Sequence, residues 1–503
     1  MSGAPPADDA TVRARLLRRN QKLSSLLEVT TALTRERHLD ALLDLILAES
    51  IKTVDADRGS LFIIDRDRTH LLSKIALGER EMIRMPMGRG IAGHVAETGR
   101  PLNIPDAYAD PRFNPTIDKT TGYHTHSILC VPMLGSRGVP VGVVQALNHQ
   151  DGPFTAEDEE LLMAFGANAA AAIENANLYE EIERLFEGFV QASVTAIESR
   201  DPTTAGHSGR VADLSVGLLR SLERSTGAYR ELRFSPVEER ELRYAALLHD
   251  FGKVGVREHV LLKANKLFPA QLQRVEARFE EARRAAEVEA LREELALLRE
   301  RGDAAKIERT QAELHARLSQ LDELLEFIRR CNQPTVLEQG GFERLSEIKG
   351  LRYLDSRGQP QRLLDDDECA NLSIGRGSLN SDERKEIESH VTHTYRFLKT
   401  IPWTKDLARV PEIAHGHHEK LGGRGYPLGV PAKELPVQTR IMTIADIYDA
   451  LTAADRPYKK AMPAERALEI LGAEVKGGAL DPELYSIFVE AKVYLRAFGL
   501  PVP

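Results

Sequence analysis

Apolar residues recur every three or four positions at both ends of the first half of the chain, over Leu16–Lys52 and Thr155–Glu183. This spacing predicts two long helices. Shorter β-branched and apolar runs lie between them and predict strands, while a glycine-opened run predicts a short helix. The expected strands are Ser60–Asp65, His70–Leu77, Ser127–Met133 and Val141–Asn148, and the short helix is Gly88–Glu97. We therefore expect an α+β domain over residues 21–180, preceded by a tail over residues 1–20.

Helical spacing continues beyond this domain. The apolar residues Ile173, Leu178, Ile182, Leu185 and Phe189 are interrupted only by the helix breaker Gly188. We expect a connecting helix over residues 165–200. Such a helix could pair with a second chain and transmit a change of register, or it could be a plain spacer. We favour pairing, so a homodimer is expected.

The second half of the chain is predicted to be helical and to contain a charged insertion over residues 269–378. Two apolar series step by three and four residues on either side of Gly302-Asp303, which predicts an antiparallel helical hairpin with a coiled-coil seam. The series are Val288, Leu291, Leu295 and Leu298, then Leu314, Leu318, Leu321, Leu325 and Ile328. The hairpin could cover a functional site, pair protomers or recruit a partner. The acidic run Asp365–Glu368 lacks the spacing of a calcium loop, so we expect a solvated loop there.

Composition narrows the class of protein. The chain has 503 residues, with 42% hydrophobic and 28% charged residues, as in ordinary globular proteins. A net charge of −9 leaves no basic footprint for nucleic acid. The N-terminus lacks the pattern of a signal peptide, and no apolar stretch is long enough to cross a membrane without charges. The 3 cysteines are widely spaced, which favours a reducing, cytoplasmic location.

Candidate chemistry centres on His249-Asp250, which follows the apolar run Tyr244–Leu248. A buried carboxylate needs a positive partner, and Lys253 three residues later or a metal ion could supply it. Further imidazoles and a second carboxylate favour the metal, because these ligands suit iron, manganese or zinc. They are His207, His390, His417, His418 and Asp446. With two carboxylates among the ligands, a pair of divalent ions would remain positive and attract phosphate. By contrast, His124 and His126 lie in a polar loop and are expected to be solvated.

The first half resembles a GAF domain over most of its length. Asn148-His149, Phe154 and Asp158-Glu159 match the Asn-Lys, Phe and Asp-Glu of cyclic-nucleotide-binding GAF domains in spacing, with His149 in place of the lysine. The resemblance implies a small-ligand site that includes Asn148, Phe154 and Asp158. The alternative is a GAF fold whose role is packing and dimerisation.

The second half, over residues 190–503, resembles the HD-GYP family. These proteins are the cyclic di-GMP phosphodiesterases of the HD metal-dependent phosphohydrolase superfamily. The segments that carry the resemblance are Gly206–Val211, His249–Lys253, His417–Pro427, Ala445–Thr452 and Arg456–Lys459. The resemblance implies an all-α fold, interrupted here by the insertion. It also implies hydrolysis of cyclic di-GMP to linear pGpG, to GMP or to both.

The same resemblance assigns roles by motif position. It implies two divalent metal ions, iron or manganese first, then zinc, nickel or magnesium. Their ligands would be His207, His249, Asp250, His390, His417, His418 and Asp446. Asp250 would bridge the metals, Lys253 would sit over the phosphate, and Arg456 and Lys459 would bind the substrate's phosphates. Gly425, Tyr426 and Pro427 would form the substrate loop. Thr203 stands where some members have a third-metal glutamate.

Two departures from the family pattern keep other functions open. Leu421-Gly422-Gly423 replaces the usual Trp-Asp-Gly, and the segment Leu451–Arg456 is one residue longer than usual. The leading hypothesis is a GAF-regulated phosphodiesterase. One alternative is a catalytically weak protein that binds cyclic di-GMP and scaffolds partners such as diguanylate cyclases. Another is an HD phosphohydrolase that acts on a different nucleotide.

Overall fold

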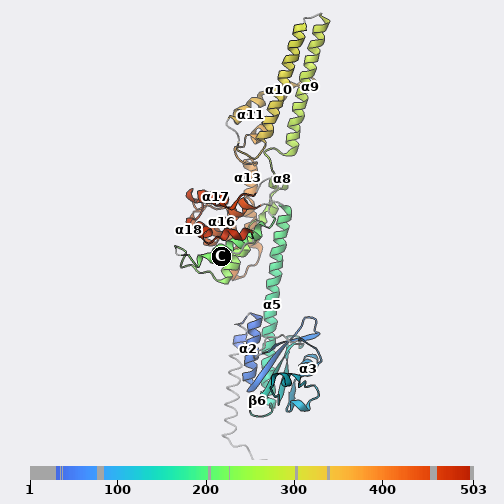
Figure 1. Ribbon diagram of the computed structural model, residues 1–503, viewed down its shortest axis with the longest axis vertical. Coiled ribbons are helices and arrows are strands. Elements are labelled where there is room, and N and C mark those ends of the chain that lie inside the picture. Colours follow the sequence, from blue (N-terminus) through green and yellow to red (C-terminus); the bar gives the residue numbers. More distant parts are fainter. Residues whose placement is uncertain are drawn as a thin grey trace, which may run out of the picture. The chain divides into compact units, whose positions relative to one another are not determined.

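A computed structural model describes residues 30–33, 35–36, 38–75, 84–201, 205–225, 227–300, 304–336, 340–453 and 461–498. The chain divides into two units, residues 1–187 and 188–503 (Figure 1). The predicted tail, the start of the first predicted helix and the last two residues of the strand predicted at His70–Leu77 lie outside the described residues. Among the helices described, none is both long and apolar enough to cross a membrane.

The first unit is built on a six-stranded antiparallel sheet with the order β3-β2-β1-β6-β5-β4. Its strands are β1 (Ala56–Ile64), β2 (His70–Ile75), β3 (Arg84–Pro86), β4 (Leu102–Ile104), β5 (Ile128–Leu134) and β6 (Pro140–His149). The long strand β6 lies between β1 and β5, so that Gln145 pairs with Ser60 on one side and Cys130 on the other. All four predicted strands are confirmed, with boundaries shifted by a few residues.

Helices cover both faces of this sheet. The helices are α2 (Leu39–Thr53), α3 (Gly90–Thr98), α4 (Thr116–Thr121) and α5 (Ala156–Arg200), with the short turn η1 (Ala107–Ala109). On one face, Leu129 and Val131 of β5 share a core with Ile46 of α2 and Phe165 of α5. On the other face, β5 packs through Cys130 against residues of α3. Because alternate residues of β5 enter two different cores, the strand is apolar throughout. The first unit is thus the expected α+β domain.

Helix α5 is the predicted connecting helix. It runs for 45 residues without a break at Gly188 and ends at Arg200, immediately before Asp201-Pro202. Proline disfavours helical backbone at the residue before it, which explains an end at this point. Leu178, Ile182 and Leu185 are 55% to 75% exposed. Pairing of two chains through this helix stays a prediction.

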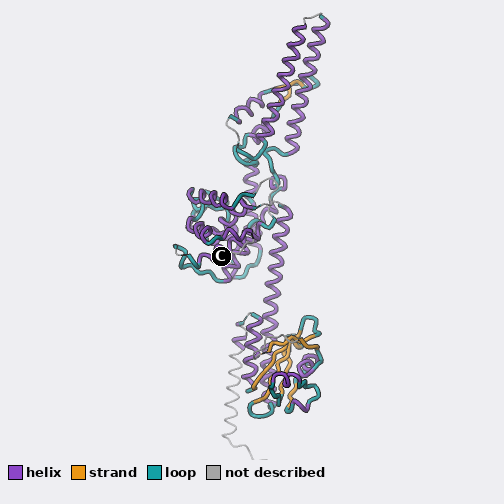
Figure 2. Tube along the Cα trace, in the orientation of Figure 1, coloured by secondary structure: helices purple, strands orange, loops and turns teal. Residues whose placement is uncertain are grey.

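The second unit is predominantly helical, as Figure 2 shows. Its helices outside the insertion are α6 (His207–Leu222), α7 (Pro236–Leu248), α8 (Glu258–Leu261), α13 (Ser381–Glu388), α14 (His390–Thr400), α15 (Val410–His415), α16 (Val437–Thr452), α17 (Ala464–Lys476) and α18 (Pro482–Glu490). Short turns are η3 (Phe251–Gly255), η4 (Lys405–Leu407), η5 (Ala432–Glu434) and η6 (Val493–Phe498). The buried faces of α6, α7 and α16 pack together, which places the ends of these helices near one another.

The insertion begins with two long helices, α9 (Pro269–Arg299) and α10 (Ala304–Cys331), which lie side by side (Figure 1). Ion pairs join Arg329 to Glu276 at 2.8 Å and Arg317 to Glu289 at 2.8 Å. In these two ion pairs the higher residue number on α10 pairs with the lower number on α9. The two helices are therefore antiparallel, as predicted. The rest of the insertion holds α11 (Gly341–Gly350), the strands β7 (Arg352–Leu354) and β8 (Pro360–Arg362), and α12 (Asp366–Leu372).

Two expectations for the insertion need correction. The seam residues predicted on α9 are wrong, because Val288, Leu291, Leu295 and Leu298 are 44% to 63% exposed. Helix α9 instead buries the face that carries Ala282, Ala286 and Ala290. The acidic run is a helix start and not a solvated loop, since the Asp365 side chain accepts the backbone N–H of Glu368 and caps α12.

Candidate metal centre

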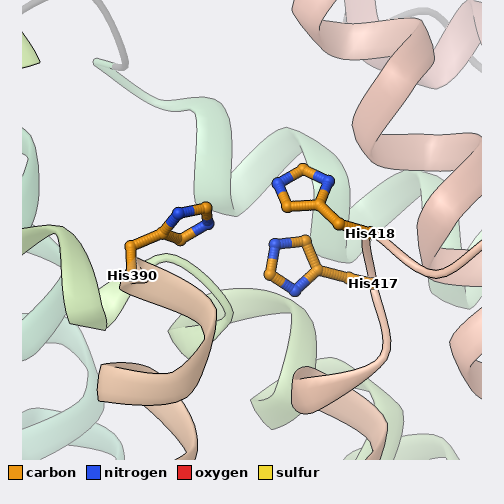
Figure 3. A group of neighbouring side chains, drawn as sticks. All are labelled: His390, His417 and His418. Atoms are coloured by element: carbon orange, nitrogen blue, oxygen red, sulfur yellow. The ribbon is translucent and has the colours of Figure 1, made fainter. Parts of the chain in front are cut away.

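Seven side chains from distant parts of the second unit meet in one place. His207 begins α6, His249 and Asp250 follow α7, His390 begins α14, His417 and His418 follow α15, and Asp446 lies within α16. They form three overlapping groups whose ligand atoms lie within 4.8 Å of one another. The groups are His390 with His417 and His418, His207 with His249 and Asp250, and His249 with His417 and Asp446. Figure 3 shows the three rings of the first group gathered together. The structure thus brings together the seven side chains proposed as metal ligands from the sequence, and their role as ligands stays a prediction.

Close packing of α14 against the turn after α7 positions two of these residues. The N–H of Gly252 donates to Thr394 Oγ1 at 2.8 Å, and the Thr394 hydroxyl donates to the carbonyl of His249 at 2.8 Å. A Cβ atom at Gly252 would lie 1.9 Å from the backbone oxygen of His390. Only glycine permits this approach. It brings His390 Nε2 to 3.3 Å from Asp250 Oδ1.

Three of the imidazoles are held in the same way. Nδ1–H of His249, His390 and His417 donates to the carbonyl three residues earlier, at 2.7, 2.5 and 2.6 Å. This bond leaves the Nε2 lone pair of each ring directed into the cluster. Each of the three Nε2 atoms is buried and has no hydrogen-bond partner among the described residues. Buried polar atoms are costly when unpaired, so the arrangement fits a bound cation.

The protonation of the histidines also suits metal binding. Burial lowers the pKa of His390 and His417, and it lowers the pKa of His418 to about 4. These three rings are therefore neutral at neutral pH, the form that ligates metal. His207 differs. Burial lowers its pKa, but the hydrogen bonds that its ring donates to Asp446 and Asp449 outweigh this effect and raise the pKa to about 9. A metal ion at His207 would have to displace this proton.

The two carboxylates are ionised despite their burial. Burial favours the neutral form of Asp250, but Lys253 and the surrounding imidazoles hold its pKa well below the usual range. The pKa of Asp446 is lowered in the same sense, chiefly by its hydrogen bond with His207 acting against burial. Lys253 Nζ lies 2.9 Å from Asp250 Oδ2 and 3.2 Å from Asp201 Oδ2. Lys253, one of the two partners expected for Asp250, is thus in place. The metal ion stays a prediction, which the neighbouring imidazoles support.

Sequence reasoning missed the residues that orient His207. Asp449 Oδ2 accepts a hydrogen bond from His207 Nδ1 at 2.7 Å, and Arg210 donates to both oxygens of the same carboxylate. Asp449 is buried and lies one helical turn after Asp446 on α16. That spacing places both carboxylates on one face of the helix, which is the signal that could have found it.

We expect Asp449→Asn to weaken metal binding about 10- to 100-fold, because loss of a partner that orients a ligand histidine has this effect in other metal sites. Calorimetric titration of metal-depleted protein with Mn²⁺ measures it. Asp213→Asn, a change at a side chain 63% exposed on α6, is the control. An unchanged affinity in Asp449→Asn protein of normal melting temperature would contradict the orienting role.

The predicted substrate loop lies against the cluster. The Tyr426 ring centre is 4.8 Å from that of His418, and a Cβ atom at Gly425 would lie 2.4 Å from Glu419 Cα. The buried Glu419 carboxylate, also missed from the sequence, accepts the N–H groups of residues 428 to 430. The His418 side chain is 28% exposed, whereas His390 is 4% exposed. The cluster therefore opens to solvent beside this loop.

Other predicted residues lie outside the described residues or have local structural partners. Arg456, Lys459 and Thr203 lie in the parts of the chain that are not described. In the first unit, Asn148 Nδ2 donates to the carbonyl of His124, Phe154 is buried in the core, and Asp158 accepts from Thr155. The GAF ligand site stays a prediction. His124 and His126 are exposed, as expected.

Comparisons with known proteins match both units. Residues 38–173 match the model of the GAF domain, and residues 204–331 and 367–484 match two models of the HD domain. The protein therefore combines a GAF domain with HD-domain segments, and the HD matches include all seven clustered residues.

One curated relative and several solved structures are similar to parts of the chain. A protein of Caenorhabditis elegans named probable 3′,5′-cyclic phosphodiesterase pde-5 is 39% identical over an alignment of 182 residues, which covers 33% of this chain. The match spans 25% of that relative's length. The GAF domain of a phosphoenolpyruvate-protein phosphotransferase from Coxiella burnetii is 23% identical with a TM-score of 0.29, covering 32% of this chain and 96% of that one. A free methionine-R-sulfoxide reductase from Neisseria meningitidis is 18% identical with a TM-score of 0.27, covering 36% and 98%.

Proposed function

We propose that this protein is a GAF-regulated, metal-dependent phosphodiesterase that hydrolyses cyclic di-GMP to linear pGpG, to GMP or to both. The observation that carries the proposal is the convergence of five imidazoles and two carboxylates, with three buried Nε2 atoms for which the described residues offer no hydrogen-bond partner. A set of neutral nitrogen ligands with only two anionic ligands suits a pair of divalent ions that keeps positive charge for a phosphate.

In this proposal the seven clustered residues would hold two divalent metal ions, iron or manganese first, and Asp250 would be a ligand to both. When bound, such ions supply Lewis acidity, which acidifies water and stabilises negative charge on phosphoryl oxygens. Asp250 faces Nε2 of His207, His249 and His390 at 3.8, 3.5 and 3.3 Å, so it is placed to serve more than one group of ligands.

Residues of the chain itself would bind and orient the substrate. Asp250 and Asp201 raise the pKa of Lys253 against the effect of burial, so its ammonium is charged at neutral pH and can hold a phosphate beside the cluster. The substrate would enter where His418 is exposed, next to Gly425, Tyr426 and Pro427. The aromatic ring of Tyr426 offers a surface on which a guanine base can stack. Arg456 and Lys459 would bind the phosphates.

The comparisons support the class of reaction more than the substrate. The relative's name refers to a 3′,5′-cyclic phosphodiesterase, which supports phosphodiester hydrolysis, and the match to the GAF domain supports regulation by a small molecule. Cyclic di-GMP itself is proposed from the HD-GYP motifs of the sequence.

A scaffolding protein with weak turnover is the second candidate. Leu421 and Gly422 occupy the base of the loop, where the Leu421 N–H donates to the Ala479 carbonyl at 3.0 Å and Gly422 forms a bridge with Pro431. Neither side chain supplies the aromatic ring or the carboxylate of the family pattern. In that case the protein would bind cyclic di-GMP and present the loop and the hairpin to partners such as diguanylate cyclases.

Turnover of three nucleotides by one metal-loaded preparation tests these functions. We expect cyclic di-GMP to be hydrolysed faster than cyclic AMP or cyclic GMP, with products separated by chromatography. Apoprotein reloaded with Mn²⁺, Fe²⁺ or Mg²⁺ identifies the active metal. Binding of cyclic di-GMP without hydrolysis would favour the scaffold. Hydrolysis of the mononucleotides alone would favour an HD phosphohydrolase with another substrate.

A further inference from the structure

Helix α9 has a second apolar face that nothing in the described residues covers. It is formed by Val288, Leu291, Leu295 and Leu298, which we call the outer stripe and which are 44% to 63% exposed. We propose that the outer stripe packs against the outer stripe of a second copy of this chain, with the two α9 helices parallel.

The outer stripe is separate from the contact within the hairpin. Ala282, Ala286 and Ala290 face α10 and are buried. At 3.6 residues per turn, the outer stripe lies on nearly the opposite side of α9 from these alanines. The small alanine side chains let α10 approach closely, so the larger leucines are left on the far side. The spacing of three, four and three residues is that of alternating core positions in a two-stranded coiled coil.

The charges that flank the outer stripe point to the partner. Arg292 and Arg299 lie along one edge, and Glu287 and Glu294 lie along the other. None of these four side chains forms an ion pair with another described residue. Val288 and Leu295 fit position a of a heptad repeat, and Leu291 and Leu298 fit position d. The two glutamates then fall at position g and the two arginines at position e. Side chains at e and g of neighbouring helices meet beside the core of a coiled coil.

Only one orientation of two identical helices makes these edges complementary. When the two helices are parallel, they are related by a two-fold axis that runs along them, and the acidic edge of each copy faces the basic edge of the other. Glu287 then meets Arg292 of the second copy, and Glu294 meets Arg299, at the usual offset of five residues. About a two-fold axis across the helices, acidic edges meet each other and basic edges meet each other, which is repulsive. The pattern thus selects a second α9 in parallel.

The stripe is too short to hold two chains together alone, because stable interfaces bury roughly 1,200–2,000 Å² in total. It therefore acts together with another contact, for which the exposed residues Leu178, Ile182 and Leu185 of α5 are available. A first contact raises the effective concentration of the second, so that even a short stripe is occupied. This proposal does not depend on the reaction that the HD domain catalyses.

Cysteine cross-linking of the full chain tests the orientation. In a parallel pair each stripe residue lies beside its own copy, within the distance that a disulfide spans. We expect Leu291→Cys and Leu295→Cys, tested separately, each to give a reducible covalent dimer under mild oxidation. Ala296→Cys, exposed on α9 but outside the stripe, is the matched control and is expected to react about tenfold more slowly. The unaltered chain reports the background from Cys130, Cys331 and Cys369.

Charge reversal tests the pairing itself. In Leu295→Cys protein, we expect Arg292→Glu with Arg299→Glu to slow cross-linking about tenfold, because four favourable pairs per dimer become repulsive. The reciprocal pair, Glu287→Arg with Glu294→Arg, should slow it equally, and a mixture of the two variants should restore the rate. Cross-linking only between Leu291→Cys and Leu295→Cys chains would indicate antiparallel helices and overturn the proposal. Absence of cross-linking at both positions would mean that the stripe receives a different occupant, which also overturns it.

Discussion

Replacement of both His249 and Asp250 by alanine is expected to lower metal affinity by more than about a hundredfold. Loss of a residue that only orients a ligand already lowers metal affinity about 10- to 100-fold, and here two proposed ligands are removed. The double variant removes one of the three Nε2 atoms that have no hydrogen-bond partner among the described residues. It also removes a carboxylate that lies within 3.8 Å of three imidazoles. It also leaves Lys253 with Asp201 as its remaining close carboxylate. Turnover of cyclic di-GMP should fall to the level of metal-free protein. Metal content after dialysis and initial rates at saturating metal measure the two effects.

The control is a double variant with the same chemical change at exposed positions, His315→Ala with Asp382→Ala. It should keep normal metal content. Circular dichroism separates loss of the centre from loss of the fold, because α7 is capped at its other end by Ser235 and Glu238 and should persist. Equal metal content and equal activity in the cluster variant and the control would rule out the proposed centre.

Gly252→Ala is expected to be among the most destabilising single substitutions near the centre. The added Cβ would lie 1.9 Å from the His390 oxygen and 2.4 Å from the Thr394 nitrogen. Both atoms belong to the backbone, so no side chain can rotate to make room. Overpacking in a core costs about 1–3 kcal/mol and occasionally more, and we expect the upper end of this range. Movement of α14 away from Gly252 would also separate His390 from Asp250 and weaken metal binding. Urea unfolding and metal titration measure these effects.

Gly209→Ala is the matched control for this prediction. Gly209 lies in α6 and has no heavy atom within 4 Å of the position of an added Cβ. Alanine favours helix over glycine by about 1 kcal/mol in a helix interior, so the control should be neutral or slightly stabilising. If Gly252→Ala has the same unfolding midpoint and metal affinity as Gly209→Ala, α14 does not pack against this turn as described.

Six of the seven clustered residues could be found from the sequence because they lie in the short segments that carry the HD-GYP resemblance, and His390 was added as a further imidazole between these segments. A histidine and an aspartate directly after the apolar run Tyr244–Leu248 are hard to explain without a partner. Four strands of the first unit could be found because runs of β-branched and apolar residues are a local property of the chain. The three-residue strands β3 and β4 were missed because they are too short to show such a run. Asp449 was missed because its partner, His207, lies more than two hundred residues away in the sequence. Only packing of α16 against α6 brings them together.

The sequence by itself determined the long helices, the longer strands of the first unit and the residues that carry metal-binding chemistry, but not the short elements β3, β4 and α12. These properties depend on neighbours a few positions apart. The tertiary structure decided which side chains meet. It placed the Ala282 face of α9 against α10 and left the outer stripe exposed, although the leucines have the stronger periodic pattern. Periodicity reports that a face is apolar, whereas the fit between two surfaces in space determines what that face contacts.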